Sequence, residues 1–283
     1  MAAPFDLTTT AAVKAWTGQT TSTQDAVIGG LVTAASRAIL AWLGRPLILP
    51  TVWTDRYDAR VGMRKLFLRN YPVVSVASVQ IGTSLIQAIN PQSLTPPGPS
   101  MYSGYILDTD PSSGAPPGQP RGVNFVDDPT VFAIYLQQAI QIVYTAGYQD
   151  SDQFTVAAGG GAQTASPLYG VWASDAGVTY VATGAALTAV ASAPATGQYS
   201  VAAGVYTFAA GDAGKAVVVN YGYIPQDLAQ ACIETVAQRL AAGSRVGVKS
   251  KSLGGQESIS YDMTAMPLAV TAALQPYKRT SFL

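Results

Sequence analysis

The sequence predicts an α+β protein, in which a small helical frame with a β-meander carries an inserted all-β domain of sandwich or barrel type. Apolar residues recur every three to four positions over 27–43 and 228–240, which indicates two amphipathic helices. Apolar and polar residues alternate between 52 and 81, which indicates strands. Residues 149–221 consist almost entirely of Ala, Gly, Thr, Val, Ser and Tyr in short alternating runs, which is typical of a separate β-unit.

The composition fits a folded protein with extensive contacts. Of its 283 residues, 48% are hydrophobic, so the chain can bury a substantial core. Charged residues make up 11%, well below the roughly 25% of an average globular chain. Together with 15 tyrosines, this suggests that much of the surface is buried against partners.

Several function classes are excluded or disfavoured. The chain has no histidine, which rules out histidine triads, histidine zinc ligands and imidazole bases. The single cysteine, Cys232, lies on an apolar helical face and is interpreted as a buried structural thiol. The most apolar run is interrupted by Ser36 and Arg37, so we expect no membrane span. The N-terminus lacks the pattern of a signal peptide, and we expect assembly in the cytoplasm.

The N-terminal part predicts two helices. The first is capped by Thr8–Thr10 and ends at Gly18. The second begins at one of two capping boxes, starting at Thr21 or at Ser22, and is ended by Gly44.

Strands follow at 52–57, 63–68 and 73–81, which we interpret as a β-meander. The segment 90–121 is rich in proline and glycine and predicts a long loop. Two further strand-like runs lie after it, at 131–136 and 139–144.

One phrase occurs twice. The strand ending at 143–148 reads VYTAGY, and the strand ending at 219–223 reads VNYGY. We interpret the segment between them as an insertion, so that residues 1–148 and 223–283 form one domain and residues 149–222 another. Alternatively, both phrases end hairpins of one continuous β-fold. The distribution of charge favours two domains, because residues 70–222 hold two basic side chains against eight acidic ones.

The C-terminal part returns to a helical pattern. Pro225 is predicted to lie in the first turn of a helix, and the apolar stripe of this helix runs over 228–240. A basic, glycine-containing segment at 245–255 is predicted to be a mobile loop, followed by a strand at 258–261 and a short helix over 266–274.

Four segments together resemble the head–tail connector, or adaptor, proteins of long-tailed double-stranded DNA bacteriophages. They read AILAWLGRPL (38–47), DRYDARVGMRKLFLRNYPVVSVASVQI (55–81), YGYIPQDLAQACIETVAQR (221–239) and VGVKSKSLGGQESISYDMTAMPLAVTAALQPYKR (246–279). The resemblance covers about 8–148 and 223–283, and residues 149–222 depart from it.

The resemblance implies a structural virion protein rather than an enzyme, with no cofactor. It implies a ring, commonly of twelve copies, that joins the portal at the capsid vertex to the tail and helps to close the head after DNA packaging. Expected partners are other copies of the chain, the portal protein and a head–tail stopper or tail terminator protein. The expected location of the protein is the head–tail interface of the virion.

Two basic clusters are the candidate sites. For a portal or subunit interface the candidates are Arg245, Lys249, Lys251, Leu253, Gly254 and Gly255, because two glycines allow a segment to reorder on binding. A second cluster consists of Arg56, Arg60, Arg64, Lys65 and Arg69. If it lined the channel of the ring, it would contact the phosphates of passing DNA. For both clusters, a merely solvated face is the alternative.

Other functions stay open at this point. A capsid decoration or tail-tube protein would share the β-unit but would not need the helices. A hydrolase would need paired carboxylates, for which Asp127–Asp128 is the only adjacent pair. The segment Asp108–Gly114 weakly resembles a calcium loop, but lacks its third acid and closing glutamate.

Overall fold

A computed structural model describes residues 5–89, 104–108, 122–126, 135–243, 250–253, 257–260 and 266–279. The chain forms two compact units. The first, which is mostly helical, comprises Met1–Leu47, Pro167–Val171 and Ile224–Thr280, and the second, which is mostly β, comprises chiefly Ile48–Ser166 and Trp172–Tyr223. The predicted α+β class is confirmed. These units do not test whether residues 149–222 are an insertion, which stays a prediction.

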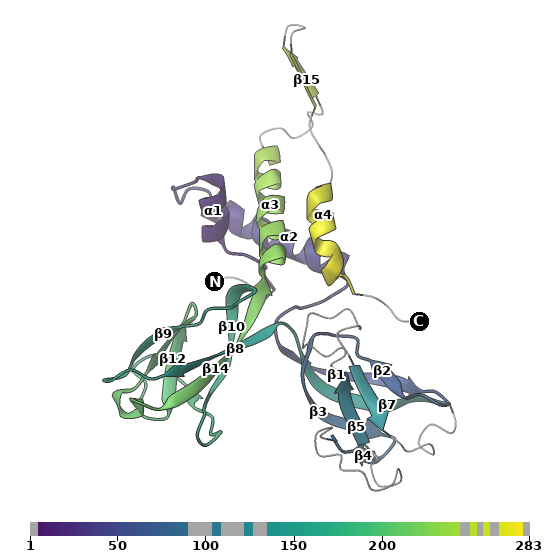
Figure 1. The fold of residues 1–283 in the computed structure, drawn as a ribbon. Coiled ribbons are helices and arrows are strands. Elements are labelled where there is room, and N and C mark those ends of the chain that lie inside the picture. Colours follow the sequence, from purple (N-terminus) through teal and green to yellow (C-terminus); the bar gives the residue numbers. More distant parts are fainter. Residues whose placement is uncertain are drawn as a thin grey trace. The chain divides into compact units, whose positions relative to one another are not determined.

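The helical unit is built around one central helix. Its helices are α1 (Thr10–Thr17), α2 (Asp25–Leu43), α3 (Gln226–Gly243) and α4 (Leu268–Leu274), and the short 3-10 turn η4 (Gln275–Tyr277) follows α4. Helix α3 contacts the other three helices, which lie around it in Figure 1. The predicted apolar stripe is the reason, because Leu228, Cys232 and Val236 are fully buried.

The helix ends follow the sequence signals only in part. Thr9 caps α1 by accepting a hydrogen bond from the Ala12 amide (3.2 Å), and Gly18 and Gly44 end α1 and α2 in the left-handed conformation. The predicted capping boxes of α2 are wrong. Gln24 precedes the helix without a side-chain cap, and the Asp25 carboxylate instead pairs with Lys14 of α1 at 2.7 Å.

Helix α2 is also long and apolar enough to cross a membrane by length and composition alone, although its interruption by Ser36 and Arg37 had predicted no membrane span. Its apolar stripe, however, has a partner within the unit. Ile28, Val32, Ile39 and Leu43 are almost completely buried, and α2 packs on α3. We therefore interpret α2 as a core helix.

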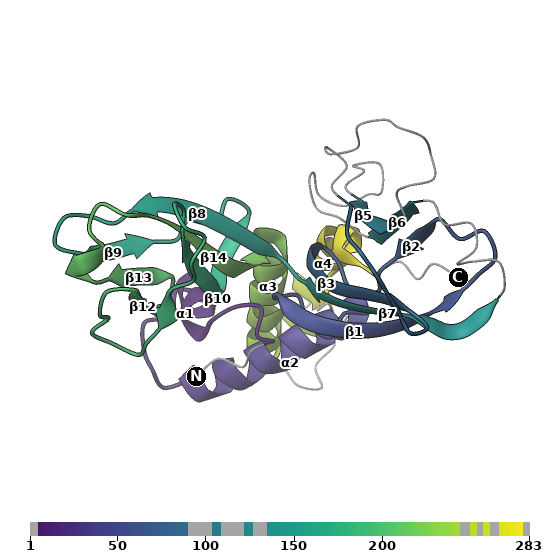
Figure 2. The same cartoon turned by 90° about the horizontal axis from the view of Figure 1, so that it is seen from below.

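The first part of the β-unit contains two small sheets. The strands of the larger sheet are β1 (Thr51–Ala59), β3 (Val73–Ile81), β4 (Ser84–Ile86) and β7 (Leu136–Ala146), in the order β1-β7-β3-β4. The strands of the smaller sheet are β2 (Lys65–Phe67), β5 (Gly104–Asp108) and β6 (Gly122–Val126), in the order β2-β6-β5. Figure 2 shows the smaller sheet on one side of the larger one, and residues of both contribute to one hydrophobic core.

The predicted β-meander is wrong. The strands themselves exist, but β7 lies between β1 and β3, and β2 belongs to the other sheet. The pattern of alternation shows which face of a strand is buried but not which strand is its neighbour. Within the predicted loop at 90–121, β5 is a strand, and the run at 139–144 is part of the longer β7. Most of the run at 131–136 lies outside the described residues.

The second part of the β-unit is a sandwich. One sheet has the order β10-β14-β8, with β8 (Gln149–Thr155), β10 (Gly170–Tyr180) and β14 (Ala216–Pro225). The other has the order β11-β12-β13-β9, with β9 (Gly161–Thr164), β11 (Thr188–Ala189), β12 (Gln198–Ala202) and β13 (Val205–Phe208). Both sheets contribute to a second hydrophobic core, which includes Val178, Val219, Tyr206 and Tyr221.

The two repeated phrases lie side by side where the chain enters and leaves this sandwich. The Tyr223 amide donates to the Tyr148 carbonyl (3.1 Å), and the two rings pack edge to face with centroids 5.8 Å apart. From there β8 and β14 run together as an antiparallel pair, in which Gln149 faces Gly222.

Candidate assembly surfaces

The first candidate interface includes a short hairpin. The backbone of Ser250–Leu253 forms β15 and pairs with β16 (Glu257–Ser260), so that Lys251 faces Ile259. The expectation of a mobile loop over 245–255 is therefore wrong for 250–253, where the alternation Ser-Lys-Ser-Leu suits a strand. In the described part of the chain, β15 and β16 pair only with each other. Four of the candidates lie outside the described residues: Arg245, Lys249, Gly254 and Gly255.

All five cations of the second candidate cluster are exposed, and two of them have a carboxylate partner. Arg56 is exposed on β1 and donates from Nε to the Gln141 side chain (3.3 Å). Arg60 and Arg64 are exposed on the turn between β1 and β2, where Gly62 has a positive φ of 71°. The remaining two cations, Lys65 and Arg69, each lie within 4 Å of a carboxylate.

Lys65 forms an ion pair with a buried acid. Its ammonium lies 2.7 Å from the Asp108 carboxylate, whose side chain is only 3% exposed, and 5.0 Å from the Phe67 ring centroid. The sequence had suggested Asp108 as the start of a weak calcium-loop resemblance. The structure instead places it opposite a cation, and the rest of that segment lies outside the described residues.

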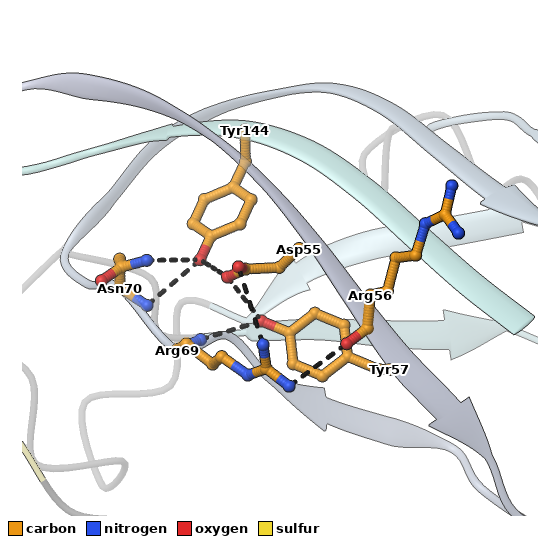
Figure 3. Close-up of polar contacts among 6 residues, drawn as sticks. All are labelled: Asp55, Arg56, Tyr57, Arg69, Asn70 and Tyr144. Atoms are coloured by element: carbon orange, nitrogen blue, oxygen red, sulfur yellow. Dashed lines mark hydrogen bonds and ion pairs between the residues drawn. The ribbon is translucent and has the colours of Figure 1, made fainter. Parts of the chain in front are cut away.

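Arg69 borders a network of polar side chains on the inner face of the larger sheet (Figure 3). The hydroxyls of Tyr144 and Tyr57 both donate to Asp55 Oδ2, at 2.6 Å and 3.2 Å. Each hydroxyl also accepts a backbone amide: Tyr57 accepts Arg69 N–H (2.9 Å), and Tyr144 accepts Asn70 N–H (3.1 Å). The network thus fixes residues 69 and 70 against β1 and β7, while the Arg69 side chain stays 53% exposed and lies 3.9 Å from the Asp55 carboxylate.

Burial determines the ionisation of these tyrosines. Removal from water, with the neighbouring Asp55, raises the pKa of Tyr144 to about 12. Burial, with the neighbouring Tyr144 as the next cause, also raises the pKa of Tyr57 above its usual range. Both hydroxyls are therefore protonated, and act as donors, at neutral pH.

The sandwich repeats this arrangement at three aspartates. Asp175 accepts from Tyr199 (2.6 Å) and Tyr206 (3.0 Å), and Asp152 accepts from Tyr221 (2.9 Å). Asp212, which is completely buried, accepts from Tyr180 (2.6 Å), Lys215 (2.8 Å) and the Gly197 amide (2.9 Å). Burial alone would raise the pKa of Asp212, but the hydrogen bonds from Lys215, Tyr180 and Gly197 outweigh it and lower that pKa.

These contacts change the interpretation of the composition. At least eight of the fifteen tyrosines donate a hydroxyl hydrogen bond to an aspartate within the chain. Much of the tyrosine content is thus used inside the fold and does not by itself indicate a surface buried against partners.

Cys232 is a buried thiol, as predicted. It is fully buried on α3, 3.4 Å from the Ser36 hydroxyl of α2, and that hydroxyl accepts the Leu7 amide (2.9 Å). Burial raises the pKa of the thiol to about 11, so it is protonated at neutral pH and is a poor nucleophile.

The described residues contain no group of three or more acidic, histidine or cysteine side chains that could hold a metal ion. The pair Asp127–Asp128 lies outside the described residues.

The helical unit exposes apolar side chains that sequence periodicity did not single out as a surface. Trp16 on α1 is 58% exposed, Val27 on α2 is 57% exposed, and Leu268 at the start of α4 is 83% exposed. Val27 lies within the apolar stripe predicted over 27–43, so periodicity predicts an apolar helical face but does not show which of its residues the fold covers.

Residues 6–101 match a family model described as Head completion protein. The matched segment contains α1, α2 and the strands β1, β2, β3 and β4, and so spans parts of both units. It supports the resemblance to head–tail connector and head completion proteins of bacteriophages. No curated protein matches the chain.

Proposed function

We propose that this chain, a structural protein of the phage head by its match to the head completion proteins, is a ring-forming adaptor that joins the portal to the tail and helps to close the head after DNA packaging. The observation that carries the proposal is the family match over residues 6–101. A virion protein of this kind acts by occupying and sealing an interface, so its chemistry lies in its contacts and not in a catalytic group.

The build of the helical unit supports an adaptor more than a decoration or tail-tube protein. Segments from both ends of the chain form it, because α3 packs on α1, α2 and α4. A β-protein that lines a tube or covers a capsid surface would not need this helical core. The family match also begins at residue 6, just before α1, and therefore includes the first half of the unit.

The proposed partners are further copies of the chain, the portal protein and a stopper or tail terminator protein. Heterologous surfaces that close by rotation generate a ring, for which we expect about twelve copies from the resemblance. Assembly would take place in the host cytoplasm.

Electron microscopy and mass measurement test this proposal, on the purified chain alone and mixed with the portal protein. We expect short rings, either of the chain alone or on the portal. Sheets or long tubes would instead favour a decoration or tail-tube protein and would overturn the proposal.

We further propose that the β15–β16 hairpin and its basic neighbours contact the portal or an adjacent subunit. An isolated two-stranded hairpin is at best marginally stable, so a partner strand or surface would stabilise it. Replacing Lys249 and Lys251 by Glu should abolish ring formation or portal attachment but leave the helix content unchanged. The variant with Ser250 and Ser252 replaced by Ala is a matched control on the same segment and should assemble. Normal assembly of the lysine variant would show that the segment is only a solvated surface.

Residues 149–222 are proposed to be an inserted domain. Two observations support this: the sandwich has its own hydrophobic core, and the chain enters and leaves it at the hydrogen-bonded pair Tyr148 and Tyr223. A deletion of 149–222 should therefore give soluble protein that retains its helices, measured by circular dichroism. An insoluble product would indicate one continuous β-fold instead.

A further inference from the structure

Several exposed hydrophobic side chains of the described residues lie together in two groups. One group lies at an end of the larger sheet, and the other lies just before and at the start of β10: Val61, Tyr135 and Leu136, and Leu168, Tyr169 and Val171. Single exposed apolar residues are normal on a soluble protein, whereas a group of them marks an interaction surface. We call the first group the sheet-end patch, and residues 167–171 the β10 loop.

Contacts between residues far apart in the sequence build the sheet-end patch. Ala59, the last residue of β1, faces Leu136 of β7. The Asp58 carboxylate accepts the Tyr135 hydroxyl (2.8 Å) and the Gln138 amide (2.8 Å). Gln138 has a positive φ of 50°, which residues other than glycine seldom adopt, and the bond to Asp58 holds this strained backbone in place. The patch is therefore held in one arrangement before any partner binds.

Three exposed arginines lie beside the patch. Arg56 is on β1, and Arg60 and Arg64 lie in the same turn as Val61. The two hydrogen bonds to Asp58, and then the nearby charge of Arg60, lower the pKa of that carboxyl. In the described part of the chain, none of the three arginines lies within 4 Å of a carboxylate. Tyrosine and arginine are enriched among the residues that carry the binding energy of protein interfaces, so this composition suits a protein partner.

The β10 loop is fixed on the helical unit and also exposes a tyrosine. The Tyr169 carbonyl accepts the amide of Gln226, the first residue of α3 (3.1 Å), and residues 167–171 belong to that unit. Tyr169 differs from most tyrosines of this fold, because its ring is exposed and its hydroxyl has no hydrogen-bond partner among the described residues. An exposed ring with an unused hydroxyl provides both apolar area and a polar contact to a partner.

The region that contains the β10 loop has the opposite charge to the arginines. Residues 149–222 hold four aspartates and one lysine. Asp152 accepts the amide of Ser166, the residue before the loop (2.8 Å), and the Tyr221 hydroxyl, while Asp175 accepts from two tyrosines and an amide. All of these donors are uncharged, so both carboxylates keep their negative charge. Electrostatic attraction therefore favours contact between this region and the arginines beside the sheet-end patch.

We propose that the sheet-end patch of one copy binds the β10 loop of a second copy. One chain carries both surfaces at different places, so the contact is head-to-tail, and its repetition closes a ring or forms a filament. Each group exposes on the order of a few hundred Å², less than the roughly 800 Å² that each partner of a stable complex buries, so this contact acts together with others. The inference rests on the proposed ring, and it assigns the region outside the head completion match a part in assembly.

Cross-linking between two differently substituted chains tests the contact. Chains with Val61→Cys and chains with Leu168→Cys are mixed, assembled alone and on the portal protein, and treated with a short bismaleimide. The native Cys232 is buried and its raised pKa keeps it protonated, so it should not react. We expect a covalent V61C–L168C dimer of full chains, identified by mass spectrometry. The matched control is Val52→Cys, which has nearly the same exposure as Val61 (66% against 68%) and should not link to L168C.

Self-association provides a second measurement, by sedimentation at increasing protein concentration. Val61→Asp and Leu168→Asp should each weaken self-association by about tenfold or more, because a charge replaces an apolar contact in the interface. Val52→Asp should leave self-association unchanged. Added salt should also weaken it, since it screens the arginines. Thermal unfolding of each variant separates loss of contact from loss of fold.

The outcomes separate this contact from the adaptor role. Rings without a V61C–L168C link would overturn the contact and leave the adaptor role standing. A link in filaments or dimers, with no rings alone or on the portal, would support the contact and contradict the adaptor role. A link from V61C to the portal protein instead of L168C would assign the patch to the portal and overturn the proposal, as would absence of the link from every assembly.

Discussion

Individual residues in this protein are held by pairs of tyrosine hydroxyls and aspartate carboxylates. Asp55 accepts two tyrosine hydroxyls in the larger sheet, and Asp175 accepts two in the sandwich. A buried carboxylate is costly without partners, and each tyrosine brings a donor together with a large apolar ring. The low content of lysine and arginine in residues 70–222 is consistent with this, since Asp152, Asp175 and Asp212 accept hydrogen bonds from four tyrosine hydroxyls and from one lysine.

Replacing Tyr144 by Phe should lower the free energy of unfolding by about 1–3 kcal/mol, because Asp55 and the Asn70 amide each lose a buried partner. Tyr135 is the matched control: it donates to Asp58 at 2.8 Å but is 58% exposed, so Tyr135→Phe should change stability by no more than about 0.5 kcal/mol. Denaturant unfolding measures both. Equal effects of the two substitutions would contradict the role assigned to Tyr144.

The buried tyrosines also predict a loss of stability at alkaline pH. Burial raises the pKa of Tyr144 to about 12 and raises those of Tyr199, Tyr206 and Tyr221 as well, while an unfolded tyrosine titrates near 10. A raised pKa in the folded state stabilises the fold fully below pH 10, and this contribution is lost as the pH rises through the folded value.

The free energy of unfolding, measured by denaturant titration, should therefore fall between pH 10 and pH 12. The fall should be less steep in Tyr199→Phe or Tyr221→Phe, since each removes one such group. A stability that is constant to pH 12, or an equal slope in the variants, would contradict the proposed burial of these hydroxyls.

At the scale of secondary structure, local signals located most elements but not their neighbours. Thr9 caps the beginning of α1, and Gly18 and Gly44 follow the last residues of α1 and α2, as their sequence contexts predict. The β-meander was predicted wrongly because β7, far along the chain, pairs with both β1 and β3. The alternation of apolar and polar residues in 52–57 and 73–81 was compatible with a meander and with the observed strand order, since both bury the same faces of these strands.

The same limit applies to the candidate sites. Arg60 and Arg64 are exposed, as a binding surface requires, but no local pattern indicates that Lys65 faces Asp108 or that Arg69 faces Asp55. The contact between residues 43–45 and 277–279 was not predicted, because these segments are far apart in the sequence and only the packing of the fold brings them together.

The hairpin of β12 and β13 gives a prediction about an element. Its two-residue turn, Ala203–Gly204, has positive φ at both positions, 49° and 84°. A Cβ at Gly204 would lie 3.1 Å from Trp172 Cγ, whereas at Gly214, with φ 77°, it would meet nothing within 4 Å. Gly214→Ala should therefore cost about 1–2 kcal/mol from backbone strain alone, and Gly204→Ala should cost more. Thermal unfolding of the two variants compares them, and a larger loss for Gly214→Ala would contradict the described turn.

At the scale of the whole molecule, the chain combines a helical unit made from both of its ends with β-structure from its middle. The head completion match includes the first half of the helical unit and the strands that follow it. The sandwich of residues 149–222 lies outside the match and has its own core. The head completion match therefore concerns the part of the chain that precedes the sandwich.

The central claim is that this chain closes the DNA-filled head, and the amount of nuclease-resistant DNA in heads tests it most directly. Heads of the phage that encodes the chain would be prepared without it, filled with DNA, and treated with nuclease before and after addition of the purified protein. We predict that heads without the chain lose their DNA and that the added protein, bound at the portal vertex, protects it. If heads without the chain retain their DNA, or if the added protein gives no protection, the chain is not a head-closing adaptor.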